Sequence, residues 1–180
     1  MRINKYLADC GICSRREADT LIKDGQVSIN GRVAVLGDQV TEKDKVVFEE
    51  KTLKPESKKI YIAFHKPFGV ISTTGKEYTN RVIDHIKIPE RVITIGRLDV
   101  ESSGILLLTN DGDIVNKLLK SVNKKEKQYV VTVNKHLTKD VLENLKNGVI
   151  IDSRKTLPAK IEQISPTQFS ITIIEGKNRQ

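Results

Sequence analysis

Tryptophan is absent from the chain, and aromatic residues of all kinds make up only 4% of its 180 residues. No apolar run approaches the roughly 20 residues that a membrane-spanning helix needs. The start of the sequence, Met1 to Lys5, lacks the apolar core of a secretory signal peptide. We therefore expect a cytoplasmic chain that makes no contact with a membrane.

Cysteine is also scarce, and the two that are present, Cys10 and Cys13, form a single C-x-x-C pair. A zinc site takes about four ligands, and the three histidines, His65, His85 and His136, lie far away in the sequence. A redox pair of the thioredoxin type needs a strand before it and a helix after it. The pattern predicts neither, so we expect two reduced thiols and no bound metal.

Acidic residues are fewer than basic ones: the chain has 23 Asp and Glu residues and 31 Lys and Arg residues, which gives a net charge of +8. Residues 1–58 hold 11 basic and 10 acidic side chains, whereas residues 59–180 hold 20 and 13. Basic side chains that neutralise phosphates release counterions, which favours a polyanionic partner. Five lysines, at positions 117, 120, 124, 125 and 127, fit a solvated helix end as well as a phosphate-binding strip.

The first 48 residues predict a small domain of two helices and a hairpin. Arg2 to Asp9 has helical apolar spacing, and Ser14 with Glu17 forms the capping box of a second helix. Asn30-Gly31 lies between two strand-like runs and favours a tight hairpin, because both turn positions tolerate positive φ. Residues 49–59 are polar and lack apolar periodicity, so we predict a linker there.

Residues 60–180 mix strand and helix patterns, which indicates an α+β fold. Helical patterns begin near Asp111 and at Thr138, and strand patterns occupy residues 60–64, 92–95, 105–109, 129–133, 159–164 and 169–174. The run from Ile105 to Thr109 is continuously apolar, so we expect a strand that is buried on both faces.

One carboxylate, Asp99, lies in a loop between two of these strand patterns, within the string GRLDVESSGILLLTNDG that runs from Gly96 to Gly112. In an extended loop, Arg97 and Asp99 point to one side and Leu98 to the other. A cation and an anion then face the same cleft. For an isolated RLD tripeptide, the simplest interpretation is a structural ion pair between Arg97 and Asp99.

The whole string resembles the catalytic signature of the pseudouridine synthases that act on small-subunit and large-subunit ribosomal RNA, which reads GRLD, a short variable stretch and SGLLLLTNDG. Three further segments resemble motifs of that family: Lys66 to Ser72 (K-P-x-G-x-x-S), Lys127 to Val131 with its tyrosine, and Glu175 to Gln180. The N-terminal part resembles the RNA-binding domain named after ribosomal small-subunit protein four. Residues 11–18 and 70–74 are most similar to the large-subunit synthase F group.

The resemblance implies an RNA-binding domain at residues 1–48, a linker at 49–59 and a largely antiparallel synthase domain at 60–180. Because the family's last motif continues past the position of Gln180, we expect a chain truncated at its C-terminus. The implied enzyme is an isomerase, an intramolecular transferase that converts a specific uridine of ribosomal RNA, in the 23S molecule, to pseudouridine. Structured RNA is the expected partner, with transfer RNA as an alternative substrate, and the protein is expected to be a monomer that needs no cofactor.

The resemblance also assigns roles to residues. Asp99 is the expected nucleophile on a flipped-out uridine, supported by Arg97 or Arg179 as the cation that keeps it ionised and by Tyr129 as a stacking surface. The residues expected to bind RNA or substrate are Arg97, Leu98, Asn110, Lys177, Asn178, Arg179 and Gln180 in the synthase part, and Arg2, Lys5, Arg15, Arg16 and Arg32 in the N-terminal domain.

Two other functions are compatible with the sequence. A non-catalytic RNA-binding or ribosome-assembly factor would bind RNA without isomerising it. A glycosidase-like hydrolase is disfavoured, because such enzymes commonly use two carboxylates and no motif supplies a second one.

Overall fold

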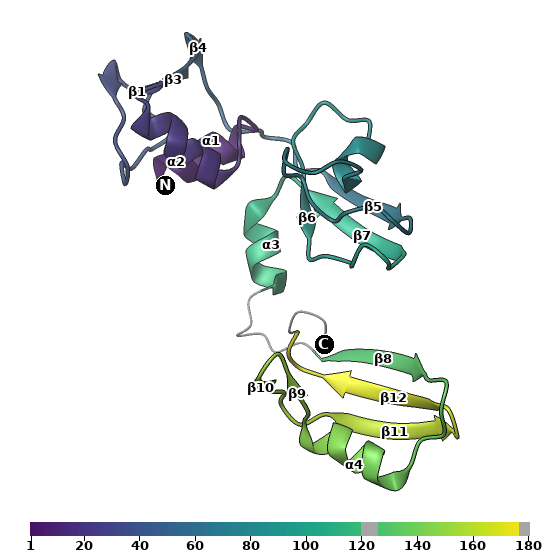
Figure 1. Ribbon diagram of the computed structural model, residues 1–180. Helices are drawn as coiled ribbons and strands as arrows, with labels where there is room; N and C mark the ends of the chain where they lie inside the picture. The colour runs from purple at the N-terminus through teal and green to yellow at the C-terminus, as the bar shows by residue number, and fades with distance from the viewer. Residues whose placement is uncertain (120–125, 177–180) are drawn as a thin grey trace. The chain divides into compact units, whose positions relative to one another are not determined.

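The computed structural model describes residues 1–119 and 126–176 (Figure 1). It divides into two compact units, Met1–Leu119 and Lys120–Gln180. The elements of the first unit are α1 (Ile3–Asp9), α2 (Arg15–Lys23), β1 (Val27–Ile29), β2 (Arg32–Val33), β3 (Val46–Phe48), β4 (Lys51–Thr52), β5 (Tyr61–Lys66), the 3-10 helix η1 (Val82–His85), β6 (Ile93–Ile95), β7 (Gly104–Thr109) and α3 (Gly112–Leu119). Those of the second unit are β8 (Lys127–Thr132), α4 (Lys139–Asn147), β9 (Ile150–Ile151), β10 (Arg154–Lys155), β11 (Lys160–Ser165) and β12 (Gln168–Ile173).

The two N-terminal helices begin and end where their sequence signals lie. The backbone N–H of Glu17 donates to the Ser14 hydroxyl at 3.2 Å, and the Ser14 N–H donates to the Glu17 carboxylate at 2.7 Å. This reciprocal pair satisfies two of the backbone donors that a helix start leaves without partners. The predicted capping box is confirmed.

The hairpin at Asn30-Gly31 is also confirmed, with φ of 52° and 85° at the two turn positions. It joins β1 to β2 in an antiparallel sheet of order β2-β1-β3-β4. The last strand was not predicted. β4 pairs with β3, and Leu53 after it is buried in the core formed with the two N-terminal helices.

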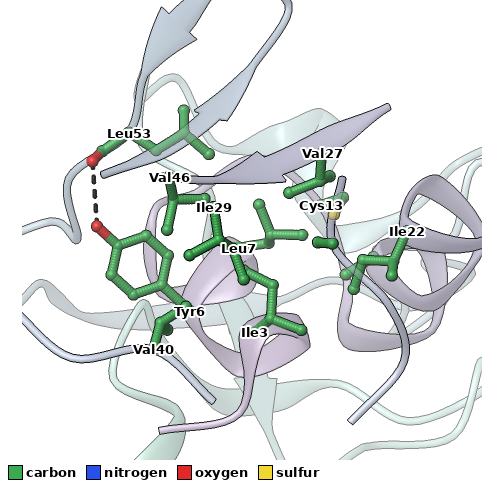
Figure 2. Packing of buried hydrophobic residues seen from close by; sticks show 12 residues of the cluster. Ile3, Tyr6, Leu7, Cys13, Ile22, Val27, Ile29, Val40, Val46 and Leu53 are labelled. Carbon is green, nitrogen blue, oxygen red and sulfur yellow. Dashed lines mark hydrogen bonds between the residues drawn. The ribbon is translucent and has the colours of Figure 1, made fainter. Parts of the chain in front are cut away.

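The core of this N-terminal domain, which we define as α1 to β4, lies between the two helices and the sheet (Figure 2). Ile3 and Leu7 of α1 and Val27 and Val46 of the sheet all belong to this core, and all four are almost fully buried. The hydroxyl of Tyr6 donates to the Leu53 carbonyl at 3.1 Å, which gives a buried aromatic residue its polar partner and ties the end of the domain to its first helix.

A second antiparallel sheet, of order β5-β7-β6, follows in the same unit. Leu106 and Leu108 of β7 are buried in a core with Val70, Val82 and Val92 from the segment between β5 and β6. Ile105 and Leu107 on the opposite face are 72% and 44% exposed. The expectation of a strand buried on both faces is therefore wrong, because within the described unit the connecting segment packs on one face only.

The second unit contains the antiparallel sheet β11-β12-β8, with α4 packed against β11 (Figure 1). The predicted cap of α4 is confirmed, since the Thr138 hydroxyl accepts the N–H of Val141 at 3.3 Å. A short hairpin, β9-β10, was not predicted. Its turn residues Asp152 and Ser153 both have positive φ.

Every strand pairing among the named strands is antiparallel, and the described chain contains runs of consecutive strands with few helices between them. The predicted α+β class with largely antiparallel sheets is thus confirmed. Among the described helices, none is both long enough and apolar enough to cross a membrane.

Candidate active site

The loop that carries Asp99 leaves β6 and enters β7 through two glycines. Gly96 has φ of +78° and Gly104 has φ of +140°, both in the region that side chains with a Cβ rarely adopt. The chain therefore turns away from the sheet at one glycine and returns at the other. Residues 97–103 form the excursion between them, which we call the Asp99 loop.

Ser72 holds the start of the Asp99 loop, at Leu98. Its hydroxyl donates to the Leu98 carbonyl at 2.6 Å and accepts the Leu98 N–H at 3.1 Å, so both backbone groups of Leu98 are paired with one side chain. Ser72 is itself buried, and the Leu98 side chain packs against the core beneath the sheet. Leu98 therefore faces inward, whereas Arg97 and Asp99 are exposed, in agreement with the alternation that the sequence predicted.

Lys66 holds Val100, the residue that follows Asp99 in the loop. Its side chain is fully buried at the end of β5, and its ammonium donates to the carbonyls of Val70 at 2.7 Å, Pro67 at 2.9 Å and Val100 at 3.4 Å. The Val100 carbonyl also accepts the N–H of Gly69 at 2.8 Å. A buried charge is costly unless its donors are satisfied, and here three carbonyls satisfy them while joining the turn after β5 to the Asp99 loop.

The backbone on both sides of Asp99 is thus fixed, and its own carbonyl accepts the N–H of Ser102 at 3.0 Å. The carboxylate, by contrast, is exposed and makes no hydrogen bond or ion pair with any residue of ranges 1–119 and 126–176. Arg97 is also exposed and forms no ion pair with it. The interpretation of these two residues as a structural ion pair is therefore wrong.

Neither Ser72 nor Lys66 was assigned a role from the sequence. Both belong to the segment Lys66 to Ser72 that resembles the family's K-P-x-G-x-x-S pattern, and that resemblance was the available signal. Their partners in the Asp99 loop, Val100 and Leu98, lie 34 and 26 positions further along the chain, so the spacing within the segment did not reveal them.

Tyr129, the predicted stacking residue, lies on β8 of the second unit opposite Ile171 of β12, and its side chain is 49% exposed. Its ring is accessible to a planar partner. Lys177, Asn178, Arg179 and Gln180 lie outside the described residues, as do Lys120, Lys124 and Lys125 of the predicted lysine strip.

Asn110 has a different environment from the one expected of a substrate-binding residue. Its amide oxygen accepts the N–H of Ile60 at 2.9 Å, and its amide nitrogen donates to the Glu56 carboxylate at 2.7 Å and to the Lys58 carbonyl at 2.9 Å. The donors and the acceptor are all engaged with the segment before β5. This arrangement favours ordering of the chain over contact with a base.

The five basic residues predicted to contact RNA from the N-terminal domain fall into two groups. Arg2, Arg15 and Arg16 are exposed and form no ion pair with a residue that the structure describes. Arg32 pairs with Asp38 at 2.8 Å, and Lys5 pairs with two carboxylates. The first group is therefore better suited to phosphate contacts than the second.

In the described ranges, no group of three or more His, Cys, Asp or Glu side chains is arranged to hold a metal ion. Cys10 and Cys13 are free thiols, half-buried and buried respectively. Burial raises the pKa of Cys10 to about 12, with a further contribution from the Asp9 and Glu56 carboxylates. Burial also raises the pKa of Cys13, so both side chains are protonated near neutral pH.

Comparison with known proteins identifies the family. A family model described as RNA pseudouridylate synthase matches residues 60–180, and a model of the S4 domain matches residues 1–46. The chain belongs to the RNA pseudouridylate synthase family. The resemblance seen in its motifs is confirmed.

Two curated relatives illustrate the range of this synthase family. The chain is 41% identical over 182 residues to the dual-specificity RNA pseudouridine synthase RluF of Escherichia coli strain K12, an alignment that covers all of this chain and 63% of the relative. It is 40% identical over 189 residues to ribosomal large subunit pseudouridine synthase B of Bacillus subtilis strain 168, covering 99% and 77%. The chain thus spans less than two thirds of the length of RluF.

A solved structure shares the fold of this synthase-family chain. It is a crystal structure of a pseudouridylate synthase, 26% identical, that superimposes with a TM-score of 0.62 over 99% of this chain and 79% of the other. The S4 match and the order of the two family models agree with the predicted order of an RNA-binding domain followed by a synthase domain. The predicted boundaries at residues 48 and 60 stay a prediction.

Proposed function

We propose that this chain carries the activity of an RNA pseudouridine synthase, an isomerase that acts on a uridine of ribosomal RNA, in the large subunit, with Asp99 as the nucleophile. The observation that carries the proposal is the state of Asp99. Its backbone neighbours are fixed by Ser72 and Lys66, while its carboxylate is exposed and without a partner among the described residues. A positioned but unengaged carboxylate is what nucleophilic catalysis needs.

The reaction breaks the bond between N1 of uracil and C1′ of the ribose. The base then turns, and a bond forms between C5 and C1′, with loss of the C5 proton and gain of a proton at N1. Atoms balance without an external reactant, so the chemistry requires no metal, redox cofactor or energy source. The Asp99 carboxylate either attacks the sugar or assists ionisation of the glycosidic bond, and both routes need it in the charged form.

The substrate uridine has to leave its stack before a side chain can reach its sugar or base, and an aromatic ring offers it a surface. We assign this role to Tyr129, and assign Arg97 to substrate phosphate or to Asp99 once substrate has excluded water. Exposure of both side chains supports these assignments. Arg2, Arg15 and Arg16 are the proposed phosphate contacts of the N-terminal domain.

The experiment is to incubate the 180-residue chain with ribosomal RNA from a strain that lacks large-subunit pseudouridines and to map new pseudouridines. One or a few modified positions are expected, with no release of free uracil. Free uracil would indicate a hydrolase, and binding without any modified position would indicate a non-catalytic RNA-binding or assembly factor. Either result would refute the proposed activity, and transfer RNA serves as the second substrate class in the same assay.

A further inference from the structure

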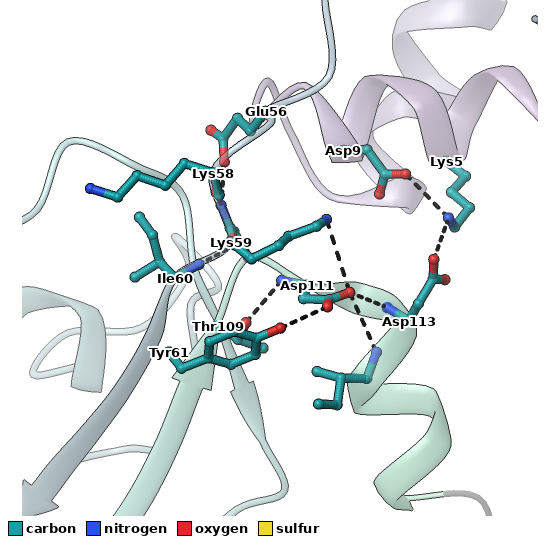
Figure 3. A network of polar contacts seen from close by, with 12 residues as sticks. Lys5, Asp9, Glu56, Lys58, Lys59, Ile60, Tyr61, Thr109, Asp111 and Asp113 are labelled. Carbon is teal, nitrogen blue, oxygen red and sulfur yellow. Dashed lines mark hydrogen bonds and ion pairs between the residues drawn. The ribbon is translucent and has the colours of Figure 1, made fainter. Parts of the chain in front are cut away.

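A group of polar contacts joins the N-terminal domain to the residues that follow β7 (Figure 3). The Lys5 ammonium on α1 contacts the Asp9 carboxylate at 3.2 Å and the Asp113 carboxylate, in the first turn of α3, at 3.1 Å. Lys5 was predicted to bind phosphate. Its charge is instead shared between two carboxylates, one of them 108 positions away in the sequence.

Glu56 makes a second connection. Its backbone N–H donates to the Asp9 carbonyl at the end of α1 at 3.0 Å, and its carboxylate accepts from the Asn110 amide at 2.7 Å. The same carboxylate lies directly against Gly11, where a Cβ would collide with it. Glu56 therefore contacts both the N-terminal domain and Asn110, the residue that follows β7.

Contacts on the synthase side hold these anchor points in place. The Tyr61 hydroxyl donates to Asp111 at 3.0 Å, Lys59 lies 4.0 Å from the same carboxylate, and the Asp111 N–H donates to the Thr109 hydroxyl at 2.9 Å (Figure 3). Burial alone would lower the pKa of Lys5, but the hydrogen bonds that its ammonium donates to Asp113 and Asp9 outweigh this effect and raise the pKa. The amine is therefore held in its charged form.

The position of these contacts along the chain suggests their purpose. The Asp99 loop ends where β7 begins, and Asn110 follows immediately after β7 ends. A six-residue antiparallel strand is about 20 Å long. The contact site and the candidate nucleophile are thus separated by one rigid strand, whose length sets a fixed spacing between the attachment of the N-terminal domain and the reacting carboxylate.

We propose that Lys5, Glu56, Asn110 and Asp113 form a clasp that docks the N-terminal domain against the end of β7, and that this docking selects which RNA shape presents its uridine to Asp99. The selection part rests on the proposed function. In this view Lys5 is a positioning residue, and the recognised substrate is a folded RNA that spans both domains.

Docking is measured first, by residual dipolar couplings of backbone amides in the 180-residue chain. In the native chain, residues of the N-terminal domain and of β5 to β7 share one alignment tensor. Asp113→Lys gives separate tensors, and the double variant K5E/D113K, which exchanges the charges of the pair, restores a common one. Separate tensors in the native chain, or a common tensor in D113K, would overturn the clasp whether or not the chain is active.

Asp140→Lys is the matched control, because Asp140 also lies in the first turn of a helix, α4, and has no ion-pair partner in the described chain. It makes the same change in charge and in helix-end electrostatics. In Asp140→Lys, the N-terminal domain and β5 to β7 should still share one alignment tensor. Asp113→Asn provides a milder variant if D113K fails to fold, and a surface ion pair of this kind should shift the docked population about threefold.

Selection is measured next, as kcat/KM on a long folded ribosomal RNA fragment relative to a short hairpin that contains the same uridine. In D113N the ratio falls about threefold, while turnover of the hairpin is unchanged. K5E/D113K restores the ratio. If Lys5 instead contacts phosphate, the charge exchange cannot restore it, and that result would contradict the assignment. Absence of turnover on both RNAs in the native chain would refute the proposed function and leave the docking result standing.

Discussion

At the scale of single residues, the geometry of the candidate site depends on buried side chains that bond the backbone beside Asp99. Ser72 is a donor and an acceptor to the two backbone groups of Leu98. Because Leu98 precedes Asp99, its fixed backbone fixes the direction in which the carboxylate leaves the chain. A hydroxyl on a neighbouring segment thereby determines the geometry of a reactive group that it does not touch.

Ser72→Ala should lower both stability and activity. The N–H and carbonyl of Leu98 lose their partner in a partly buried setting, at a cost of about 1–3 kcal/mol in the free energy of unfolding. Turnover falls while RNA affinity is kept, since no RNA contact is removed. Urea unfolding, kcat and RNA binding are the measurements. Ser103→Ala, an exposed serine of the same loop, is the control, and an equal effect in both variants would contradict the assignment.

The two cysteines should be unreactive in the folded chain. Because burial raises the pKa of Cys10 to about 12, almost none of its thiolate is present at pH 8. Iodoacetamide should alkylate Cys10 at least about a hundredfold more slowly in the folded chain than in the urea-unfolded chain, where this thiol has an ordinary pKa, and Cys13 should also react more slowly when folded. Mass spectrometry follows the reaction. Rapid labelling of native protein, or a Cys10–Cys13 disulfide in it, would be inconsistent with two buried thiols.

The sequence predicted part of this residue-scale arrangement. Alternation along an extended loop correctly put Leu98 inward and Arg97 and Asp99 outward. It could not predict that Arg97 and Asp99 do not pair with each other, because side chains on one face of a loop can still diverge. Nor could it predict the partners of Asn110, which are brought together by folding over 50 positions.

At the scale of elements, the Asp99 loop and the turn after β5 are joined into one structure by the buried ammonium of Lys66. Three carbonyls from Pro67, Val70 and Val100 surround it. A methionine of similar length would fill the space but offer no donor. Among the described residues, the two loops would keep the backbone bond from Gly69, the pairing of Ser72 and the packing of Leu98, but lose the contact that Lys66 makes with both.

Lys66→Met should therefore lower the free energy of unfolding by about 2 kcal/mol. The buried carbonyls lose their charged donor, and this loss outweighs the gain from no longer burying an ammonium group. Turnover should fall more than RNA affinity. Lys135→Met, the same change at an exposed position, should alter stability by less than about 0.5 kcal/mol. Equal turnover in native protein and K66M would show that Lys66 does not order the loop.

The capping box of α2 predicts a pH dependence. Hydrogen bonds from the backbone and side chain of Ser14 hold the pKa of Glu17 below its ordinary value. A group whose pKa is lowered on folding stabilises the fold above its unfolded pKa, about 4.3 for Glu, and this contribution is lost as pH falls through the folded pKa. In thermal unfolding, Glu17→Gln should have a lower midpoint temperature than the native chain at pH 6, and this difference should shrink towards pH 3.

The control for this prediction is Glu42→Gln, an exposed carboxylate without a hydrogen-bond partner in the described chain. It should change the midpoint little at any pH. If the difference in midpoint between the native chain and Glu17→Gln grew on acidification, it would have the wrong sign for a carboxylate with a lowered pKa.

Elements with strong local signals were predicted, and those without them were missed. The capping box at Ser14, the turn at Asn30-Gly31 and the cap at Thr138 are local, so the sequence alone sufficed. β4 and the β9-β10 hairpin have only two residues per strand and no apolar alternation. The exposed face of β7 was missed because an apolar run does not reveal what covers each side.

At the scale of the whole molecule, the order of RNA-binding domain and synthase domain could be predicted because each carries its own motifs. The clasp between Lys5 and Asp113 could not, since it joins positions 108 residues apart through side chains with no pattern of their own. Lys5 was predicted to bind RNA on the same grounds as Arg15 and Arg16. Only the structure separates the basic residues already paired from those with no ion-pair partner.

The central claim is that the Asp99 carboxylate performs the reaction, and Asp99→Asn tests it most directly. The amide has the same size but no charge, so the fold and the RNA-binding surface are preserved. With RNA labelled by tritium at C5 of uridine, the native chain should release tritium to water as the new carbon–carbon bond forms. The variant should bind the RNA with the same affinity and lose turnover by a factor of about 10⁴ or more. Undiminished tritium release by D99N would contradict the account.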